Sequence, residues 1–317
     1  MKSITTIGCV GAGLIGQGWA TQFCSAGYDL VLYDVNNAVL ESALGHIESN
    51  LTFLEAHEFI GRGETAGALK RIRTTCSLAE AVGHADYVQE SVSENYAVKK
   101  QIFKEMDLLA PAGVILASSS SGLLMTEIQK AVALPQRCVL VHPYLPVYLM
   151  PLVEVVGGRQ TTPDALATAC DLMETVGKVP VLLQKEVSGY IVNRLQAALL
   201  REAIDLVDSG VASAEAVDKA FRLSLGLRGP LLGPLLRAHL AADGIERFFE
   251  NYAASYRRRW ESMAVWNAIP DRAAAAVAKS VNTMESVRTK SLPELKTWRD
   301  EMLVKILKLI DNGKPGP

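Results

Sequence analysis

The sequence has few cysteines and histidines, and neither residue occurs in the spacing that a disulfide framework or a metal site requires. Its five cysteines are an odd number with no C-x-x-C pair, and its five histidines are scattered along the chain. Small disulfide-stabilised domains and zinc sites carry closely spaced pairs of these residues. We therefore expect free thiols in a reducing compartment, and no bound metal.

A basic excess and an uninterrupted apolar segment are also absent. Lysine and arginine total 32 against 34 acidic residues, which gives a formal net charge of -2. Nucleic-acid-binding domains usually carry a basic excess, so we expect no nucleic acid partner. The uncharged stretches at residues 3–28 and 108–126 are interrupted by glycine, proline or serine, so neither is expected to span a membrane. A cytoplasmic location is the expectation.

The chain is rich in apolar residues, which form 49% of its 317 positions, and its length corresponds to about two domains. Up to about residue 185, short β-branched runs alternate with helical patterns, which favours a parallel sheet covered by helices on both faces. Strands are expected at 4–10, 28–33, 72–76, 86–89, 114–118, 138–142, 152–156 and 179–183. Beyond residue 188 the periodicity is helical, with helices expected at 191–206 and around 214–225, 240–252, 273–281 and 293–310.

A glycine-rich segment separates the first expected strand from a helix at 14–26. Gly11, Gly13 and Gly16 match the G-x-G-x-x-G pattern, and Asp34 ends the next strand. In dinucleotide sites such glycines allow a tight turn, admit the pyrophosphate and let helix and strand pack closely. The free amides of the helix N-terminus then hold the phosphate charge. Together these features predict an α/β fold, with a Rossmann-type doubly wound sheet at 1–187 followed by an all-helical domain at 188–317.

Asp34 also indicates which dinucleotide binds. Its carboxylate would accept hydrogen bonds from the adenosine ribose hydroxyls and would repel a 2′-phosphate. No arginine follows it at positions 35–37 to hold such a phosphate. The sequence therefore predicts NAD as the cofactor.

His142 and Glu154 are candidates for acid–base chemistry. His142 ends an expected strand, at the edge where doubly wound sheets place their chemistry, and imidazole titrates near neutrality as a general base should. Glu154 lies in an otherwise apolar strand, where an unpaired carboxylate would be costly. Beside the imidazole it would fix the tautomer and stabilise the imidazolium. From these two residues alone, a structural histidine and a strand-edge glutamate remain an open alternative.

Two further polar features could belong to the same site. Four successive serines at 118–121 follow an expected strand, and Asn193 lies inside an apolar helical pattern where a buried amide needs partners. A solvated loop with a helix cap would explain the serines equally well. Spacing alone does not decide between these interpretations.

The chain resembles the L-3-hydroxyacyl-CoA dehydrogenase superfamily. The resemblance is carried by five segments in this order, at 11–16, 117–123, 142–143, 151–155 and 189–195. Within it the chain is most similar to the branch of lambda-crystallin and L-gulonate 3-dehydrogenase, with the carnitine dehydrogenases next. The resemblance implies that His142 is the general base and Glu154 its partner, with Ser121 and Asn193 as hydrogen-bonding groups on the substrate side. It implies a homodimer formed through the helical domain. The cofactor-binding residues that it implies are Gly11, Gly13, Leu14, Ile15, Gly16, Asp34, Glu94 and Lys99, the last two near the nicotinamide.

One position departs from the family pattern. The usual His-Pro-x-Asn-Pro is His142-Pro143-Tyr144-Leu145-Pro146 here, so Leu145 replaces an asparagine. A leucine side chain neither donates nor accepts a hydrogen bond. Cofactor orientation or substrate choice must therefore depend on other residues.

The superfamily acts on acyl-CoA thioesters and on small free 3-hydroxy acids. Residues 48–73 lack the lysine-rich arm that family members use against the CoA phosphates, and they are expected to form a helical hairpin. Arg228 is either a surface residue or a bidentate partner for a substrate carboxylate. We therefore expect NAD-dependent oxidation of a small L-3-hydroxy acid, such as L-gulonate, to the 3-keto acid.

Two alternatives stay open at this point. The first is a dehydrogenase for carnitine or for a short-chain 3-hydroxyacyl-CoA. A carnitine site should surround the quaternary ammonium with aromatic rings, for which Tyr144, Tyr148 and Trp266 are candidates. The second is a catalytically weak NAD-binding structural protein of the crystallin type.

Overall fold

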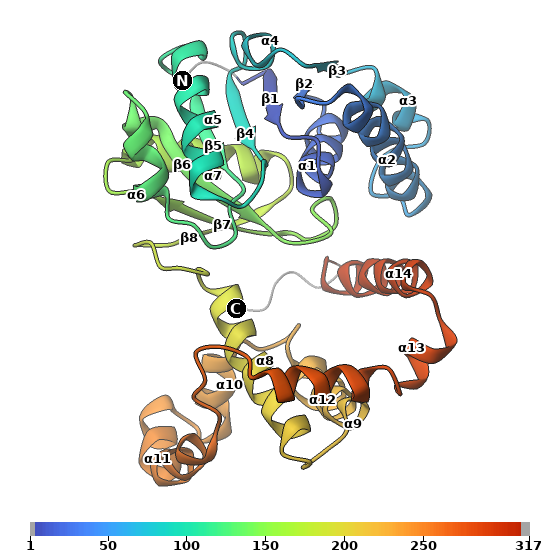
Figure 1. The fold of residues 1–317 in the computed structure, drawn as a ribbon, viewed down its shortest axis with the longest axis vertical. Coiled ribbons are helices and arrows are strands. Elements are labelled where there is room, and N and C mark those ends of the chain that lie inside the picture. Colours follow the sequence, from blue (N-terminus) through green and yellow to red (C-terminus); the bar gives the residue numbers. More distant parts are fainter. Residues whose placement is uncertain (1–3, 312–317) are drawn as a thin grey trace. The chain divides into compact units, whose positions relative to one another are not determined.

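The computed structural model describes residues 4–311, and the chain divides into two compact units after Arg194 (Figure 1). The sequence predicts this boundary at residue 187. The division lies later because residues 190–192 are held by the first unit. Tyr190 is fully buried, and the backbone N–H groups of Ile191 and Val192 both donate to the Glu154 carboxylate.

The first unit is built on an eight-stranded sheet with the order β3-β2-β1-β4-β5-β6-β7-β8 (Figure 1). The six strands from β3 to β6 in that order run parallel, which confirms the predicted α/β fold of the Rossmann type. The strands are β1 (Thr6–Val10), β2 (Asp29–Tyr33), β3 (Ile72–Thr75), β4 (Tyr87–Glu90), β5 (Ile115–Ser118), β6 (Cys138–Pro143), β7 (Leu152–Gly157) and β8 (Val179–Leu182).

The last two strands depart from the parallel arrangement that the strand–helix alternation favours. β7 runs antiparallel to β6, and β8 runs parallel to β7. A parallel return needs a crossover of a dozen or more residues, and the connection at 144–151 is too short for one. The chain therefore turns straight back, and this reversal places His142 opposite Glu154 in the ladder.

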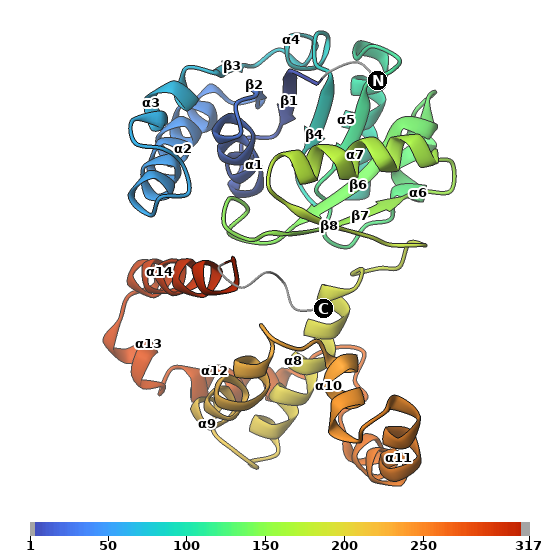
Figure 2. The same cartoon turned by 180° about the vertical axis from the view of Figure 1, so that it is seen from behind.

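Helices cover both faces of this sheet, as the strand–helix alternation predicts. One apolar cluster packs α1 (Leu14–Ser25), α2 (Asn37–Ala56) and α7 (Pro163–Thr175) on one face, around Trp19 and Phe23. A second cluster packs α4 (Leu78–Val82), α5 (Tyr96–Leu109) and α6 (Met125–Ile128) on the other, around Phe103 and Met106. The two views show α5 and α7 on opposite faces (Figures 1 and 2). The short α3 (Glu64–Leu69) packs against α2 to form the expected hairpin.

The second unit contains helices and no strand among its described residues, as predicted. Its elements are α8 (Val192–Asp208), which begins in the first unit, α9 (Ala214–Phe221), a π-helical segment (Arg222–Gly226), α10 (Pro234–Ala241), α11 (Ile245–Ser262), α12 (Asp271–Val281), α13 (Glu285–Thr289) and α14 (Leu292–Asp311). The single helix expected around 240–252 is wrong. Asp243 and Gly244 have φ values of 53° and 146°, which a right-handed helix excludes, so α10 ends before them and α11 begins after them.

Within residues 4–311, no helix combines the length and the apolar character that crossing a bilayer requires.

Candidate active site

The glycine-rich turn connects β1 to α1 and is too tight for side chains at two of its positions. Gly11 has φ of 100°, and a Cβ there would lie 2.8 Å from the Ser91 carbonyl oxygen. A Cβ on Gly16 would lie only 1.8 Å from the Gly11 carbonyl oxygen. A Cβ on Gly13, in contrast, would meet no protein atom within 4 Å. Gly13 therefore borders open space at the start of α1, where a pyrophosphate can approach the backbone.

Asp34 follows β2 and lies beside this turn. Its Oδ2 accepts a hydrogen bond from the Ala12 N–H at 3.0 Å, and its Oδ1 accepts one from the Asn36 N–H at 3.2 Å. Leu14 and Ile15 are the first two residues of α1, and Leu14 is mostly exposed. The carboxylate is thus fixed next to the glycines, as a ribose-binding acidic residue requires.

His142 and Glu154 form a buried pair. They are register partners on β6 and β7, and His142 Nδ1 lies 3.0 Å from Glu154 Oε2. Only 4% of His142 and 1% of Glu154 are exposed. Because a carboxylate accepts hydrogen bonds, Nδ1 carries the proton and Nε2 is left as the basic nitrogen. This is the tautomer that a general base needs.

The Glu154 carboxylate receives three further hydrogen bonds. The Tyr144 hydroxyl donates to Oε2, and the N–H groups of Ile191 and Val192 donate to Oε1 at 2.8 and 3.1 Å. Burial opposes ionisation of Glu154, but the bonds from His142, Tyr144 and the two N–H groups outweigh it and lower the pKa of this carboxyl. Glu154 is therefore an anion at neutral pH, ready to stabilise an imidazolium.

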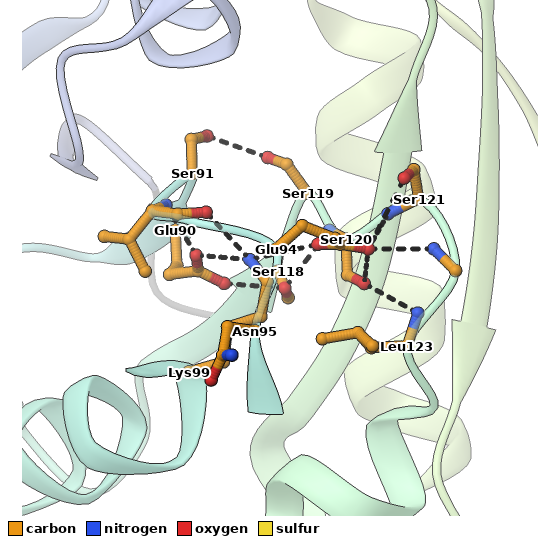
Figure 3. A network of polar contacts seen from close by, with 12 residues as sticks. Glu90, Ser91, Glu94, Asn95, Lys99, Ser118, Ser119, Ser120, Ser121 and Leu123 are labelled. Carbon is orange, nitrogen blue, oxygen red and sulfur yellow. Dashed lines mark hydrogen bonds and ion pairs between the residues drawn. The ribbon is translucent and has the colours of Figure 1, made fainter. Parts of the chain in front are cut away.

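The serine loop after β5 is organised by Glu94. Oε1 of Glu94 accepts hydrogen bonds from the Ser120 hydroxyl at 2.7 Å and from the N–H groups of Ser121 and Gly122 at 2.9 and 3.0 Å. Figure 3 shows Glu94 facing Ser120 and Ser121 across the ends of β4 and β5. Burial alone would raise the pKa of Glu94, but these bonds and the nearby Lys99 lower it. The loop conformation thus depends on an ionised carboxylate.

Lys99 contacts the carboxylate of Glu94, which organises this loop. Its ammonium is 2.7 Å from Glu90 Oε1 and 3.6 Å from Glu94 Oε2, and only 1% of the residue is exposed. Ser118 completes the group by donating to Glu90 Oε2 at 2.6 Å (Figure 3). The Lys99 ammonium is thus paired with two carboxylates, and its position near the nicotinamide stays a prediction.

Asn193 joins the serine loop to the segment that contacts Glu154. Its Nδ2 donates to the Ser121 carbonyl oxygen at 3.0 Å. Tyr190 donates to the Leu123 carbonyl oxygen at 2.6 Å, and its ring lies 5.3 Å from the His142 ring. The structure thereby links Ser121 and Asn193 to the surroundings of the His142–Glu154 pair, and their contact with the substrate stays a prediction.

Arg228 belongs to the second unit. Its guanidinium donates to the backbone oxygen and the hydroxyl of Ser224, at 3.2 and 3.1 Å, one turn earlier in the chain. Leu145 is about half exposed, in the connection that follows His142. Among the described residues, no group of three histidine, cysteine or acidic side chains is placed to hold a metal ion.

Sequence reasoning missed Glu90 and the role of the Tyr144 hydroxyl. Glu90 ends a strand whose other residues are all buried, so a carboxylate there needs a partner just as Glu154 does. That signal was available in the sequence. Tyr144 carries no comparable signal, because its hydroxyl bond depends on the antiparallel turn.

Two family models match the chain. Residues 6–187 match the NAD binding domain of 3-hydroxyacyl-CoA dehydrogenase, and residues 189–280 match the C-terminal domain of the same enzyme. The chain is 36% identical to L-carnitine dehydrogenase of Oceanobacillus iheyensis, over 99% of this chain and 100% of that one. It is 34% identical to lambda-crystallin of Oryctolagus cuniculus, over 96% of each chain.

Two solved dehydrogenase structures are also similar to this chain. The structure of 5-formyl-3-hydroxy-2-methylpyridine 4-carboxylic acid 5-dehydrogenase, described as an NAD+ dependent dismutase, aligns with a TM-score of 0.83. The two chains are 27% identical, and the alignment covers 98% of this chain and 99% of that one. 3-Hydroxybutyryl-CoA dehydrogenase of Escherichia coli is 30% identical with a TM-score of 0.66, over 69% of this chain and 46% of that one.

Proposed function

Because the chain belongs to the 3-hydroxyacyl-CoA dehydrogenase family and is an NAD-dependent oxidoreductase, we propose that it oxidises the 3-hydroxyl of a small free L-3-hydroxy acid. The observation that carries this proposal is the buried pair of His142 and Glu154, 3.0 Å apart. A histidine held in this way is suited to remove the proton of an alcohol. The product is the 3-keto acid.

The residues around the glycine turn fit NAD. Gly13 leaves the start of α1 open to a pyrophosphate, and Asp34 is fixed beside it to accept ribose hydroxyls. When bound, NAD supplies the acceptor for the hydride that leaves C3 of the substrate. Gly11, Gly16, Leu14 and Ile15 would hold its phosphates through the turn and the first amides of α1.

The chain's own residues would move and stabilise the proton. His142 Nε2 accepts the hydroxyl proton while Nδ1 stays bonded to Glu154, and the carboxylate stabilises the imidazolium that results. General base catalysis of this type contributes about 10²- to 10⁴-fold to the rate. Ser121 and Asn193 would orient the alcohol and the forming carbonyl, with Glu94 holding the loop that carries Ser121.

The α2–α3 hairpin supports a free acid over a CoA ester. Residues 48–73 carry four acidic and four basic side chains, so this segment has no basic excess. A surface for the CoA phosphates should instead be strongly basic. Arg228 is our candidate for holding the carboxylate of a free acid.

L-Carnitine is a second candidate substrate beside L-gulonate, because the relative from Oceanobacillus iheyensis is an L-carnitine dehydrogenase. Both compounds are small free 3-hydroxy acids with a carboxylate. Tyr144 and Tyr148 lie in the connection that follows His142 and could face a quaternary ammonium. L-Carnitine would need such aromatic contacts, and L-gulonate would need hydrogen bonds instead.

The proposal is tested by following NADH absorbance with NAD and a panel of L-gulonate, L-carnitine, L-3-hydroxybutyrate and L-3-hydroxybutyryl-CoA. We expect one of the free acids to have the highest kcat/KM. The CoA ester as the best substrate would contradict the proposal. NADH binding without oxidation of any compound would favour a structural role of the crystallin type.

We also propose a homodimer formed through the helical unit. Among residues 195–310, only four hydrophobic side chains are buried, those of Ile204, Ala214, Ala273 and Val304. Large apolar side chains on α8, α10, α11 and α14 are exposed instead, and so few buried residues give too small a core for a stable unit. A second copy would cover these helices. Light scattering should give twice the chain mass of 34.2 kDa, and a monomer would contradict this.

The five thiols remain free, and three of them are buried, at Cys9, Cys24 and Cys138. Burial raises the pKa of Cys24 and of Cys138 to about 12, so both stay as unreactive thiols. Unpaired cysteines and dependence on NAD are consistent with the cytoplasmic location that we propose.

A further inference from the structure

The hydroxyl of Tyr144 lies against the same carboxylate oxygen that holds His142. Tyr144 is the first residue after β6, and its hydroxyl donates to Glu154 Oε2, which is also 3.0 Å from His142 Nδ1. Its ring meets the His142 ring edge-on, with centroids 4.7 Å apart. We propose that Tyr144 is a positioning residue that sets the proton affinity of His142 through Glu154. This inference rests on the proposed role of His142 as the base.

The Glu154 carboxylate is shared between two pairs of donors. Oε1 accepts from the N–H groups of Ile191 and Val192, and Oε2 accepts from His142 and Tyr144. Each donor spreads the negative charge and makes the anion less basic. Without the tyrosine hydroxyl, His142 would be the only donor on Oε2, and the carboxylate would attract the imidazolium more strongly. Tyr144 therefore keeps His142 a weaker base than Glu154 alone would make it.

The other groups facing His142 do not replace this effect. The ring of Tyr190 lies 5.3 Å from the His142 ring, but its hydroxyl donates to the Leu123 carbonyl oxygen instead. The charges of Glu94 and Glu186 act on Tyr190, where they add to the effect of burial in raising the pKa of its hydroxyl. Lys178 lies against the same connection as Tyr144, where its ammonium donates to the carbonyl oxygens of Val147 and Met150. Tyr144 is the residue that shares the Glu154 Oε2 atom with His142.

The direct test is the pKa of the His142 ring, measured by NMR titration in the full chain without substrate. The chain has five histidines, and the His142→Gln variant identifies the signal of His142. We expect Tyr144→Phe to raise the His142 pKa by about 0.5 to 1 pH unit, because the carboxylate loses one donor. Tyr144→Met should act in the same direction, since it also lacks the hydroxyl. Tyr28→Phe is the control, because Tyr28 precedes β2, which three strands separate from β6, and it should leave the His142 pKa unchanged.

A double-mutant cycle tests whether the effect passes through Glu154. Glu154→Gln should lower the His142 pKa, because the anion is removed. Adding Tyr144→Phe to that variant should then cause no further shift. If Tyr144→Phe leaves the His142 pKa unchanged, or shifts it equally in the Glu154→Gln background, the inference is wrong.

This readout separates the inference from the proposed function. Failure to oxidise any hydroxy acid would contradict the function while leaving the titration result intact. In an active enzyme, Tyr144→Phe should move the acid limb of the kcat/KM profile to higher pH by the same amount. An unshifted profile in an enzyme whose His142 pKa has shifted would show that His142 is not the base.

Discussion

Lys99 and Glu90 form a buried ion pair, with Nζ and Oε1 2.7 Å apart and exposed fractions of 1% and 0%. The pair joins the end of β4 to the helix α5 and lies next to Ser118, which begins the loop that carries Ser121 (Figure 3). The ammonium also donates to the Val92 carbonyl oxygen at 3.2 Å. The loop beside the candidate active site is thus supported by charges that solvent does not reach.

Removing one member of this pair should destabilise the first unit strongly. Lys99→Met leaves the Glu90 carboxylate buried without its cation, which costs about 3 to 5 kcal/mol. The double variant Lys99→Met/Glu90→Gln should recover much of that loss, because no buried charge remains. Urea unfolding followed by tryptophan fluorescence measures both. Lys104→Met, on the exposed side of the same helix, is the control and should change stability by less than about 0.5 kcal/mol.

Alanine substitutions at Gly13 and Gly16 should have different effects on NADH binding and on the stability of the fold. Gly13→Ala adds a methyl group that meets no protein atom, so the melting temperature should be retained while NADH affinity falls by about tenfold or more. Gly16→Ala places a methyl group 1.8 Å from the Gly11 carbonyl oxygen, so both stability and binding should be lost. Thermal melts with NADH titrations measure the two effects. Equal loss of stability in both variants would contradict this description of the turn.

Lys178 should make stability depend on pH above neutrality. Burial lowers the pKa of Lys178 from its ordinary value of 10.5 to about 7, while its ammonium donates to the Met150 carbonyl oxygen at 2.9 Å. Between these two values the unfolded chain binds a proton that the folded chain does not, so stability should rise with pH in this window. Lys178→Met should flatten that rise. Urea midpoints between pH 7 and 10 provide the measurement, with Lys185→Met as an exposed control. An unchanged slope in Lys178→Met would contradict the assignment.

The fold and the His142–Glu154 pair were predictable because both depend on local patterns. The strand before Gly11, the helix after Gly16 and the position of His142 at a strand end can each be read within a short window. Glu154 was identified because a carboxylate in an apolar strand needs a partner. The reversal of β7 was missed, because strand direction depends on the length of the connection at 144–151 and not on the strand's own residues.

Other features depend on contacts between distant segments. The Glu94 bonds to the serine loop join positions 26 to 28 residues apart, and Asn193 reaches Ser121 across 72 residues. No periodicity encodes such pairings. The break between α10 and α11 was missed for a different reason, because only the backbone angles of Asp243 and Gly244 show where the helix ends.

The central claim is that His142 is the base for alcohol oxidation, and pre-steady-state hydride transfer in His142→Gln tests it most directly. The variant should bind NADH with a Kd within about twofold of the wild type, and its rate of NADH formation should fall by about 10²- to 10⁴-fold. Glutamine keeps the size and polarity of the side chain but cannot accept the proton. NADH formation at the wild-type rate in this variant would contradict the account.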